Sequence, residues 1–157
     1  MPQEQAPPVF ITRLATAVTL EEGREALKYS CFPETDTARA VADAYWKRLN
    51  QRSVEPPALE LLPMEPNGGR QVAAIMDADQ PQPNSSFDRL GELKMPVLVL
   101  NGDNDVLVPT SRSWELLKMI ENAQLIIYPR SGHGFIWHYA TRVGEDVNRF
   151  LSSTDFE

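Results

Sequence analysis

Two short apolar runs constrain the fold of this chain more than any other feature. One covers Val97 to Leu100 and the other covers Leu125 to Tyr128, and each is bounded by residues that break regular structure. Unbroken apolar runs of this length are typical of strands that are buried on both faces of a parallel sheet. We therefore predict two buried parallel strands in the second half of the chain.

The stretch between the two runs has the spacing of a helix. Thr110 to Ile120 would place Trp114, Leu117 and Ile120 on one side of it. A strand, a helix and a second strand in this order form a βαβ unit, whose crossover is almost always right-handed. The fold class is therefore α/β, and the two strands should lie side by side with their carboxyl ends at one edge.

Polar residues follow both predicted strands. Asp103 and Asp105 come after the first, and His133 comes after the second between Gly132 and Gly134. Ligands bind at this edge in open α/β sheets, and neighbouring strands about 4.8 Å apart bring the two following loops within hydrogen-bonding reach. A carboxylate beside an imidazole fixes the tautomer and supports the charge that the ring gains as a base. We interpret Asp105 and His133 as a candidate acid–base pair.

Simpler roles are also open to these residues. Residues 101–105 are all of types that favour turns, whatever else they do. Asp103, which directly follows a glycine, fits a turn role well. A loop histidine can also do no more than bind a backbone carbonyl. His138 lacks the glycine setting of His133 and is expected at the surface or at a pocket rim. The two histidines and two aspartates lack zinc-type spacing, so no metal and no cofactor is expected.

The two loops together resemble the last part of an α/β-hydrolase. The residues that carry the resemblance are Gly102-Asp103-Asn104-Asp105-Val106-Leu107-Val108-Pro109 and, later, Ser131-Gly132-His133-Gly134-Phe135. The resemblance is strongest over residues 88–151, and it implies that Asp105 is the catalytic acid and His133 the catalytic base of a Ser-Asp-His triad. Members of that family are roughly twice as long as this chain, because a doubly wound sheet needs many strands.

The nucleophile of that family is not found in the sequence. No serine has glycine at both −2 and +2, so the Gly-x-Ser-x-Gly elbow is missing. Ser131 has Pro129 at −2, and Cys31 stands in a predicted helix with no glycine close to it in the chain. The sequence therefore supplies two of the three triad members.

The N-terminal part predicts helices joined by Pro-rich segments. Thr19 to Glu22 fits a capping box that opens a helix through about Ser30. Thr35 or Asp36 would cap a second helix that ends at Leu49. Val41, Tyr45 and Leu49 would form the apolar stripe of this second helix, and further helices are expected over Phe10–Val18, Gly69–Ala78 and Tyr139–Leu151.

The resemblance implies a helical cap at this place in the chain. We expect a disordered tail over residues 1–8, a helical cap (lid) over 9–87, the C-terminal part of an α/β-hydrolase core over 88–151, and a second tail over 152–157. The fold is then a partial α/β-hydrolase fold: a cap followed by the last two parallel strands and the last two helices.

Composition and charge indicate which partners and which cellular compartment to expect. The net charge is −7 and no basic cluster is present, so nucleic acid is not an expected partner. The single cysteine excludes an internal disulfide and fits a reducing compartment. The first residues lack the features of a signal peptide, and no apolar run reaches membrane-spanning length. A cytoplasmic protein without a membrane partner is expected.

Three hypotheses about function remain open. The chain could be the truncated C-terminal part of an esterase-like serine hydrolase, inactive alone, with a small ester-like substrate when completed by the missing half. It could be a non-catalytic binding or interaction module derived from an α/β-hydrolase. It could also form homo-oligomers whose copies complete the sheet by pairing at an exposed strand edge.

Overall fold

The computed structural model describes residues 19–49 and 85–153, together with positions 13, 16, 17, 51, 70, 73, 74 and 77. The helices expected over Phe10–Val18 and Gly69–Ala78, and the Pro-rich segments, lie largely outside the described residues. The elements, in chain order, are α2 (Leu20–Cys31), α3 (Asp36–Leu49), η2 (Leu90–Glu92), β1 (Val97–Gly102), α5 (Thr110–Met119), β2 (Ala123–Tyr128), α6 (Phe135–His138) and α7 (Ala140–Leu151).

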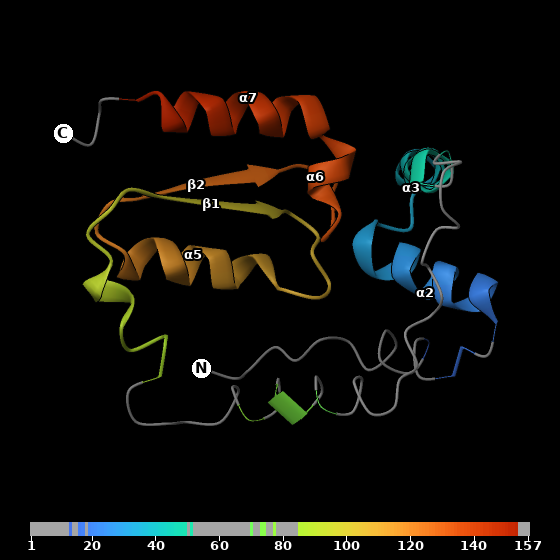
Figure 1. Ribbon diagram of the computed structural model, residues 1–157, viewed down its shortest axis with the longest axis horizontal. Coiled ribbons are helices and arrows are strands. Elements are labelled where there is room, and N and C mark those ends of the chain that lie inside the picture. The colour runs from blue at the N-terminus through green and yellow to red at the C-terminus, as the bar shows by residue number, and fades with distance from the viewer. Residues whose placement is uncertain are drawn as a thin grey trace.

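The sheet consists of β1 and β2 within the described residues, and the two strands are parallel as predicted. Their register runs from Val97 opposite Ala123 to Gly102 opposite Tyr128. The crossover helix α5 lies on one face of the sheet and the C-terminal helix α7 lies on the other, as Figure 1 shows. Both strands end at the same edge, so the loops that follow them start side by side.

The strands are less buried than their apolar sequences predict. Most of their apolar side chains are only partly buried, and full burial is confined to their carboxyl ends. A two-stranded sheet is narrow, so helices on its two faces leave both strand edges uncovered among the described residues. This arrangement explains why strands with the composition of a sheet interior remain partly exposed.

The inner side of α5 differs from the prediction. Ile120, which caps the helix, is buried, but Trp114 is 55% exposed and therefore does not share its side. The buried residue of the first turns is Ser113, whose hydroxyl oxygen accepts a hydrogen bond of 3.0 Å from Asn101 Nδ2 at the end of β1. A polar bond to the strand, which apolar spacing cannot reveal, thus faces Ser113 inward and leaves the indole in solvent.

The start of α2 and the start of α3 follow the sequence closely. Thr19 and Glu22 form the predicted capping box, with a bond of 3.2 Å from Glu22 N to Thr19 Oγ1 and one of 3.0 Å from Thr19 N to Glu22 Oε2. Thr35 caps α3, since its hydroxyl accepts from Ala38 N at 3.2 Å. These bonds satisfy amide groups that have no partner inside a helix.

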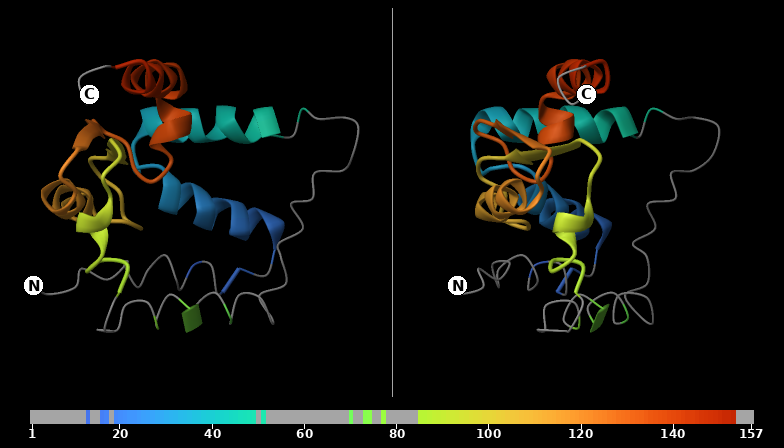
Figure 2. Two further views of the ribbon diagram at one scale, coloured as in Figure 1. Left: turned by 60° about the vertical axis from the view of Figure 1, so that its left-hand side comes forward. Right: turned by 90° about the vertical axis from the view of Figure 1, so that its left-hand side faces the viewer.

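The helices α2 and α3 lie beyond the carboxyl ends of the strands (Figures 1 and 2). An apolar cluster centred on Phe32, Ala38 and Ala42 joins them to α6. Within it, the ring of Tyr45 stacks on Trp137 of α6 with centroids 4.5 Å apart. The two helices are thus packed against the loop that follows β2, which carries His133.

A buried polar contact attaches α7 to the sheet. Tyr128 at the end of β2 is fully buried, and its hydroxyl donates to Asp146 Oδ2 of α7 at 2.9 Å. Burial, together with this bond and the charge of Asp146, raises the pKa of Tyr128 to about 12. The rings of Phe135 and Tyr139 stack on Tyr128 at 5.3 and 5.6 Å. Because Tyr128 immediately precedes the histidine loop, this contact also fixes where that loop begins.

Removing this hydroxyl should destabilise the fold. Tyr128→Phe removes the short hydrogen bond to Asp146 and leaves that carboxylate only its longer ion pairs with Arg142 and Arg149, at 3.9 and 3.6 Å. We expect a loss of about 1–3 kcal/mol in the free energy of unfolding, measured by urea denaturation. Tyr139→Phe is the matched control, because its hydroxyl donates to Pro129 O at 2.7 Å near the surface. Losses of equal size in both variants would contradict the claim that the buried bond contributes more to stability than the exposed one.

The raised pKa of Tyr128 predicts a pH dependence as well. The folded protein holds this proton more tightly than the unfolded chain, so the contribution to stability is complete below the ordinary tyrosine value of 10.0 and declines as pH rises toward about 12. Tyr128→Phe should remove this part of the alkaline decline. The measurement is the free energy of unfolding of both proteins on either side of pH about 10; parallel curves would refute the assignment.

Candidate active site

Asp105 and His133 lie next to each other beyond the carboxyl ends of β1 and β2. Asp105 Oδ2 is 3.0 Å from His133 Nδ1, which is a hydrogen-bonding distance. The carboxylate is buried, with its side chain 2% exposed, while the imidazole is 43% exposed. A buried acid therefore holds one ring nitrogen, and the ring itself remains accessible.

The loop after β1 orients the carboxylate of Asp105. Its other oxygen, Oδ1, accepts hydrogen bonds of 2.9 Å from the backbone amides of Leu107 and Val108. An aspartate that binds amides two and three residues ahead closes a local turn. Both carboxylate oxygens are thus occupied, which compensates the burial of the charge and leaves Oδ2 for the histidine.

The imidazole of His133 is a stronger base than an ordinary histidine. The hydrogen bond to Asp105 raises its pKa, the charge of Asp105 adds to this effect, and partial burial opposes it. A carboxylate can only accept, so Nδ1 carries the proton of the neutral ring and Nε2 is the atom that is able to take up another. The pair can therefore remove a proton from a group placed beside Nε2.

The C-terminus of α2 packs directly on the histidine loop. Gly134 N donates to the carbonyl oxygen of Cys31 at 2.6 Å. A Cβ added at Gly134 would lie 2.8 Å from that oxygen, and one added at Gly132 would lie 3.0 Å from it. The glycines on either side of His133 thus admit the carbonyl of a helix that is about 100 residues earlier in the chain.

Cys31 is a neighbour of the site that the sequence did not reveal. It has no glycine close to it in the chain, yet Gly132 and Gly134 lie against it in space. Burial raises the pKa of its thiol, the charge of Asp105 adds to this effect, and the hydrogen bond with Ser30 opposes it. These effects favour the protonated thiol, which is a poor nucleophile. No local signal in the sequence could have indicated this contact.

The buried serines of the described ranges are engaged in other bonds. Ser30 Oγ donates to Leu27 O at 2.8 Å, and Ser131 Oγ donates to Tyr128 O at 2.8 Å. Ser113 accepts from Asn101, as described above. Together with the missing elbow motif, these bonds leave the accessible Nε2 of His133 without a buried serine partner in the part of the chain that the structure describes.

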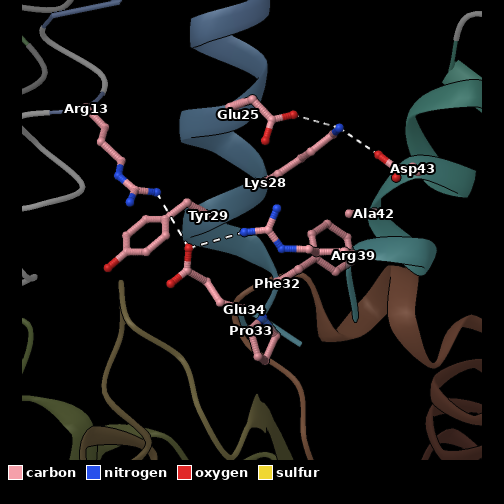
Figure 3. Close-up of a pocket in the computed structure, with 10 residues that line it drawn as sticks. All are labelled: Arg13, Glu25, Lys28, Tyr29, Phe32, Pro33, Glu34, Arg39, Ala42 and Asp43. Carbon is pink, nitrogen blue, oxygen red and sulfur yellow. Dashed lines mark hydrogen bonds and ion pairs between the residues drawn. The ribbon is translucent and has the colours of Figure 1, made fainter. Parts of the chain in front are cut away.

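Two cavities border α2. The first, of about 140 Å³, lies between α2 and α3 (Figure 3), and its charged groups pair with one another. Lys28 binds Glu25 at 2.9 Å and Asp43 at 2.6 Å, and Glu34 lies 3.4 Å from Arg39. The second, of about 200 Å³, is the one that reaches the loop of Asp105. It is lined by Tyr29, Ser30, Phe32, Pro33, Glu34, Asn104 and Val106.

Other candidate groups do not join this site. His138 is half-buried, and its ring stacks on Tyr139 with centroids 4.7 Å apart. Burial, with the nearby charge of Arg130, lowers the pKa of His138. In residues 19–49 and 85–153, no group of three side chains suits a metal ion. Nor do these ranges contain a helix with the length and apolarity needed to cross a membrane.

The fold and the site define the class of protein. An α/β-hydrolase fold protein from Chitinophaga pinensis superposes on the chain with a TM-score of 0.73 at 23% identity, covering 96% of this chain and 54% of that one. The 2-hydroxy-6-oxo-6-phenylhexa-2,4-dienoate hydrolase from Rhodococcus sp. strain RHA1 gives a TM-score of 0.60 at 18% identity, with 97% and 52% covered. The chain has the α/β-hydrolase fold and spans about half of these solved structures.

Residues 70–157, more than half of the chain, match the TAP-like protein family of α/β-hydrolases. The chain belongs to this family, and the resemblance to an α/β-hydrolase around Asp105 and His133 is thereby confirmed.

Curated relatives agree over a shorter stretch. A 2-hydroxy-6-oxononadienedioate/2-hydroxy-6-oxononatrienedioate hydrolase of Paraburkholderia xenovorans is 35% identical over 75 residues, 48% of this chain and 26% of the relative. A 2-hydroxy-6-oxo-6-phenylhexa-2,4-dienoate hydrolase of Burkholderia cepacia is 39% identical over 77 residues, 47% and 27%. A non-heme haloperoxidase of Rhodococcus erythropolis is 34% identical over 67 residues, 42% and 24%. The matches span about a quarter of these relatives.

Replacing the acid should weaken the base. In Asp105→Asn the neutral amide no longer supports the imidazolium, so we expect the pKa of His133 to fall. The raised pKa stabilises the folded protein fully below the ordinary histidine value of 6.5, and this gain is lost as pH rises through the folded pKa. Deuterium exchange at the imidazole C2 carbon, followed against pH by mass spectrometry, measures this pKa. Asp88→Asn, at an exposed site, is the control; equal shifts in both variants would contradict the pairing.

Adding one methyl group at Gly134 should separate α2 from the histidine loop. In Gly134→Ala the new carbon meets Cys31 O and Phe32, so we expect a loss of stability and faster amide exchange in α2. Gly144→Ala is the matched control, since nothing lies within 4 Å of a Cβ there, and alanine in a helix should add about 0.5–1 kcal/mol. A Gly134→Ala protein as stable as wild type would show that α2 can move away from the added methyl group without loss of stability.

Proposed function

We propose that the chain supplies the acid and the base of a Ser-Asp-His hydrolase. The observation that carries this proposal is the 3.0 Å contact between a buried carboxylate and an accessible imidazole. His133 Nε2 takes the proton of an attacking hydroxyl and later gives it to the leaving group, while Asp105 holds the ring and balances its charge. The role of each residue agrees with the family to which the chain belongs.

The nucleophile and the oxyanion hole come from polypeptide other than the described residues. The chain contains no Gly-x-Ser-x-Gly elbow, and the buried serines near the site are held in other bonds. The partly exposed strands support the same view, because a parallel pair normally lies inside a wider sheet. Covering β1 with further strands would complete the sheet and bring a nucleophile to Nε2.

The substrate is a small molecule with a reactive carbonyl carbon. Esters are the first candidates, and the names of the curated relatives add the 2-hydroxy-6-oxo dienoates. We propose that α2 and α3 form part of a lid over this substrate. The cavity of about 200 Å³ between α2 and the loop of Asp105 is the space that we propose for part of this substrate, because Asn104 and Val106 on either side of Asp105 line it.

A non-catalytic binding module remains the second candidate function. It is favoured by the missing elbow motif, because a base without a group to deprotonate contributes little to hydrolysis. A second copy of the chain that pairs along the edge of β1 would cover the strand without adding a nucleophile. Both candidates start from the same fold and differ only in what completes it.

A chimera tests the acid and the base directly. The segment of the Burkholderia cepacia hydrolase that matches this chain is replaced by the corresponding residues of this chain, and hydrolysis of the dienoate and of an aryl ester is measured. We expect turnover that falls by about a thousandfold or more in the His133→Ala chimera, because the triad acts as a unit. A folded, active chimera that His133→Ala leaves unchanged would refute the role of His133.

The chain by itself should not turn over an aryl ester above background. Wild type and His133→Ala are expected to give the same rate, since an acid and a base without a nucleophile have nothing to activate. Size-exclusion chromatography of the same sample reports whether copies associate. Clear turnover by wild type that disappears in His133→Ala would reveal a nucleophile within the chain and overturn the proposal.

A further inference from the structure

Asp103 makes a contact that its place in a turn does not require. Its carboxylate oxygen Oδ1 accepts a hydrogen bond of 3.1 Å from the backbone amide of Ser131, in the loop after β2. The sequence suggests a local turn role for this aspartate, but the partner is 28 residues away in the chain. Asp103 therefore connects the loop after β1, which carries Asp105, to the loop after β2, which carries His133.

The two loops continue the pairing of the strands beyond the sheet. Asp103 N donates to Tyr128 O at 3.0 Å, and Asn104 N donates to Ser131 O at 2.9 Å. A Cβ at Gly102 would collide with that same carbonyl of Ser131. Ser131 is fully buried and is held at its amide by Asp103 and at its carbonyl by Asn104.

The register changes between the sheet and these loops. Along the strands the paired residues differ by 26 positions, as for Val97 with Ala123 (123 − 97) and Gly102 with Tyr128 (128 − 102). Asp103 with Ser131 and Asp105 with His133 both differ by 28 positions. Two additional residues are thus accommodated after β2, where Arg130 adopts a left-handed backbone with φ of 51°.

The carboxylate of Asp103 holds this shifted register. With the register of the sheet, Asp105 would face Ser131 rather than His133. The bond from Ser131 N to Asp103 fixes the loops after the two-residue shift, and the same offset two residues later brings Asp105 to His133. We propose that Asp103 is a positioning residue, which sets the contact between the acid and the base of the proposed hydrolase pair by clamping Ser131.

The experiment compares two conservative variants that separate charge from geometry. Asp103→Asn removes the charge and keeps an oxygen where Ser131 N donates, whereas Asp103→Glu keeps the charge and moves the oxygen by one methylene group. The readout is the pKa of His133, measured by deuterium exchange at C2 with mass spectrometry. His138→Gln serves as the background, because the chain has two histidines and His133 is then the only imidazole.

A positioning role of Asp103 and a role through its charge alone predict opposite changes in the pKa of His133. If Asp103 positions the loop, the pKa of His133 stays near wild type in Asp103→Asn, and in Asp103→Glu it moves toward the value found in Asp105→Asn. Asp103→Ala, which has neither charge nor acceptor, should move at least halfway to that value. If Asp103 acts only by its charge, the pKa falls in Asp103→Asn and is unchanged in Asp103→Glu.

The result expected for a role through charge alone would overturn the proposal. A pKa of His133 equal to that of wild type in all three Asp103 variants would overturn it as well. Circular dichroism and the unfolding midpoint of each variant show that the comparison is made between folded proteins. The proposal rests on the proposed function for its meaning, but the measurement needs no turnover. A folded chimera whose hydrolysis does not depend on His133 would therefore refute the hydrolase role and leave the positioning result to be judged separately.

Discussion

The buried carboxylate of Asp105 is the constraint on which the rest of the site depends. A charge with 2% of its side chain exposed is tolerated only where both oxygens have partners. The amides of Leu107 and Val108 satisfy one oxygen, and the imidazole of His133 satisfies the other. The first two partners are local and require only a turn. The third requires a parallel strand, a crossover helix and a shifted loop. The burial of this carboxylate therefore depends on the fold as a whole.

Local features of the sequence were the ones that could be predicted. The two strands, the capping box at Thr19 and the start of α3 each follow from residues a few positions apart. The parallel pairing follows from the strand–helix–strand order. The proximity of Asp105 to His133 was predictable as well, since parallel strands end at one edge. The catalytic roles of both residues stay predictions, as do the domain boundaries.

Contacts that neither apolar periodicity nor the order of the elements specifies could not be predicted. Trp114 lies outside because Ser113 bonds Asn101 on the strand, and periodicity counts only apolar residues. Asp103 has the composition of a turn residue, and its bond to Ser131 appears only once the register of the two loops is known. The contact of Cys31 with the glycines around His133 joins segments about 100 residues apart. In each case a short-range pattern allowed several outcomes, and one long-range polar contact or close approach selected among them.

The histidine loop is held from two sides, and this has a consequence for how the base can move. Asp103 and Asn104 in the loop after β1 bind Ser131 near its start, while Cys31 at the end of α2 binds Gly134. The ring of His133 projects between these two supports and stays 43% exposed. A shift of α2 would be transmitted to Gly134 through a hydrogen bond of 2.6 Å and a contact without room for a Cβ. The position of α2 and the position of the His133 loop therefore depend on each other through this contact.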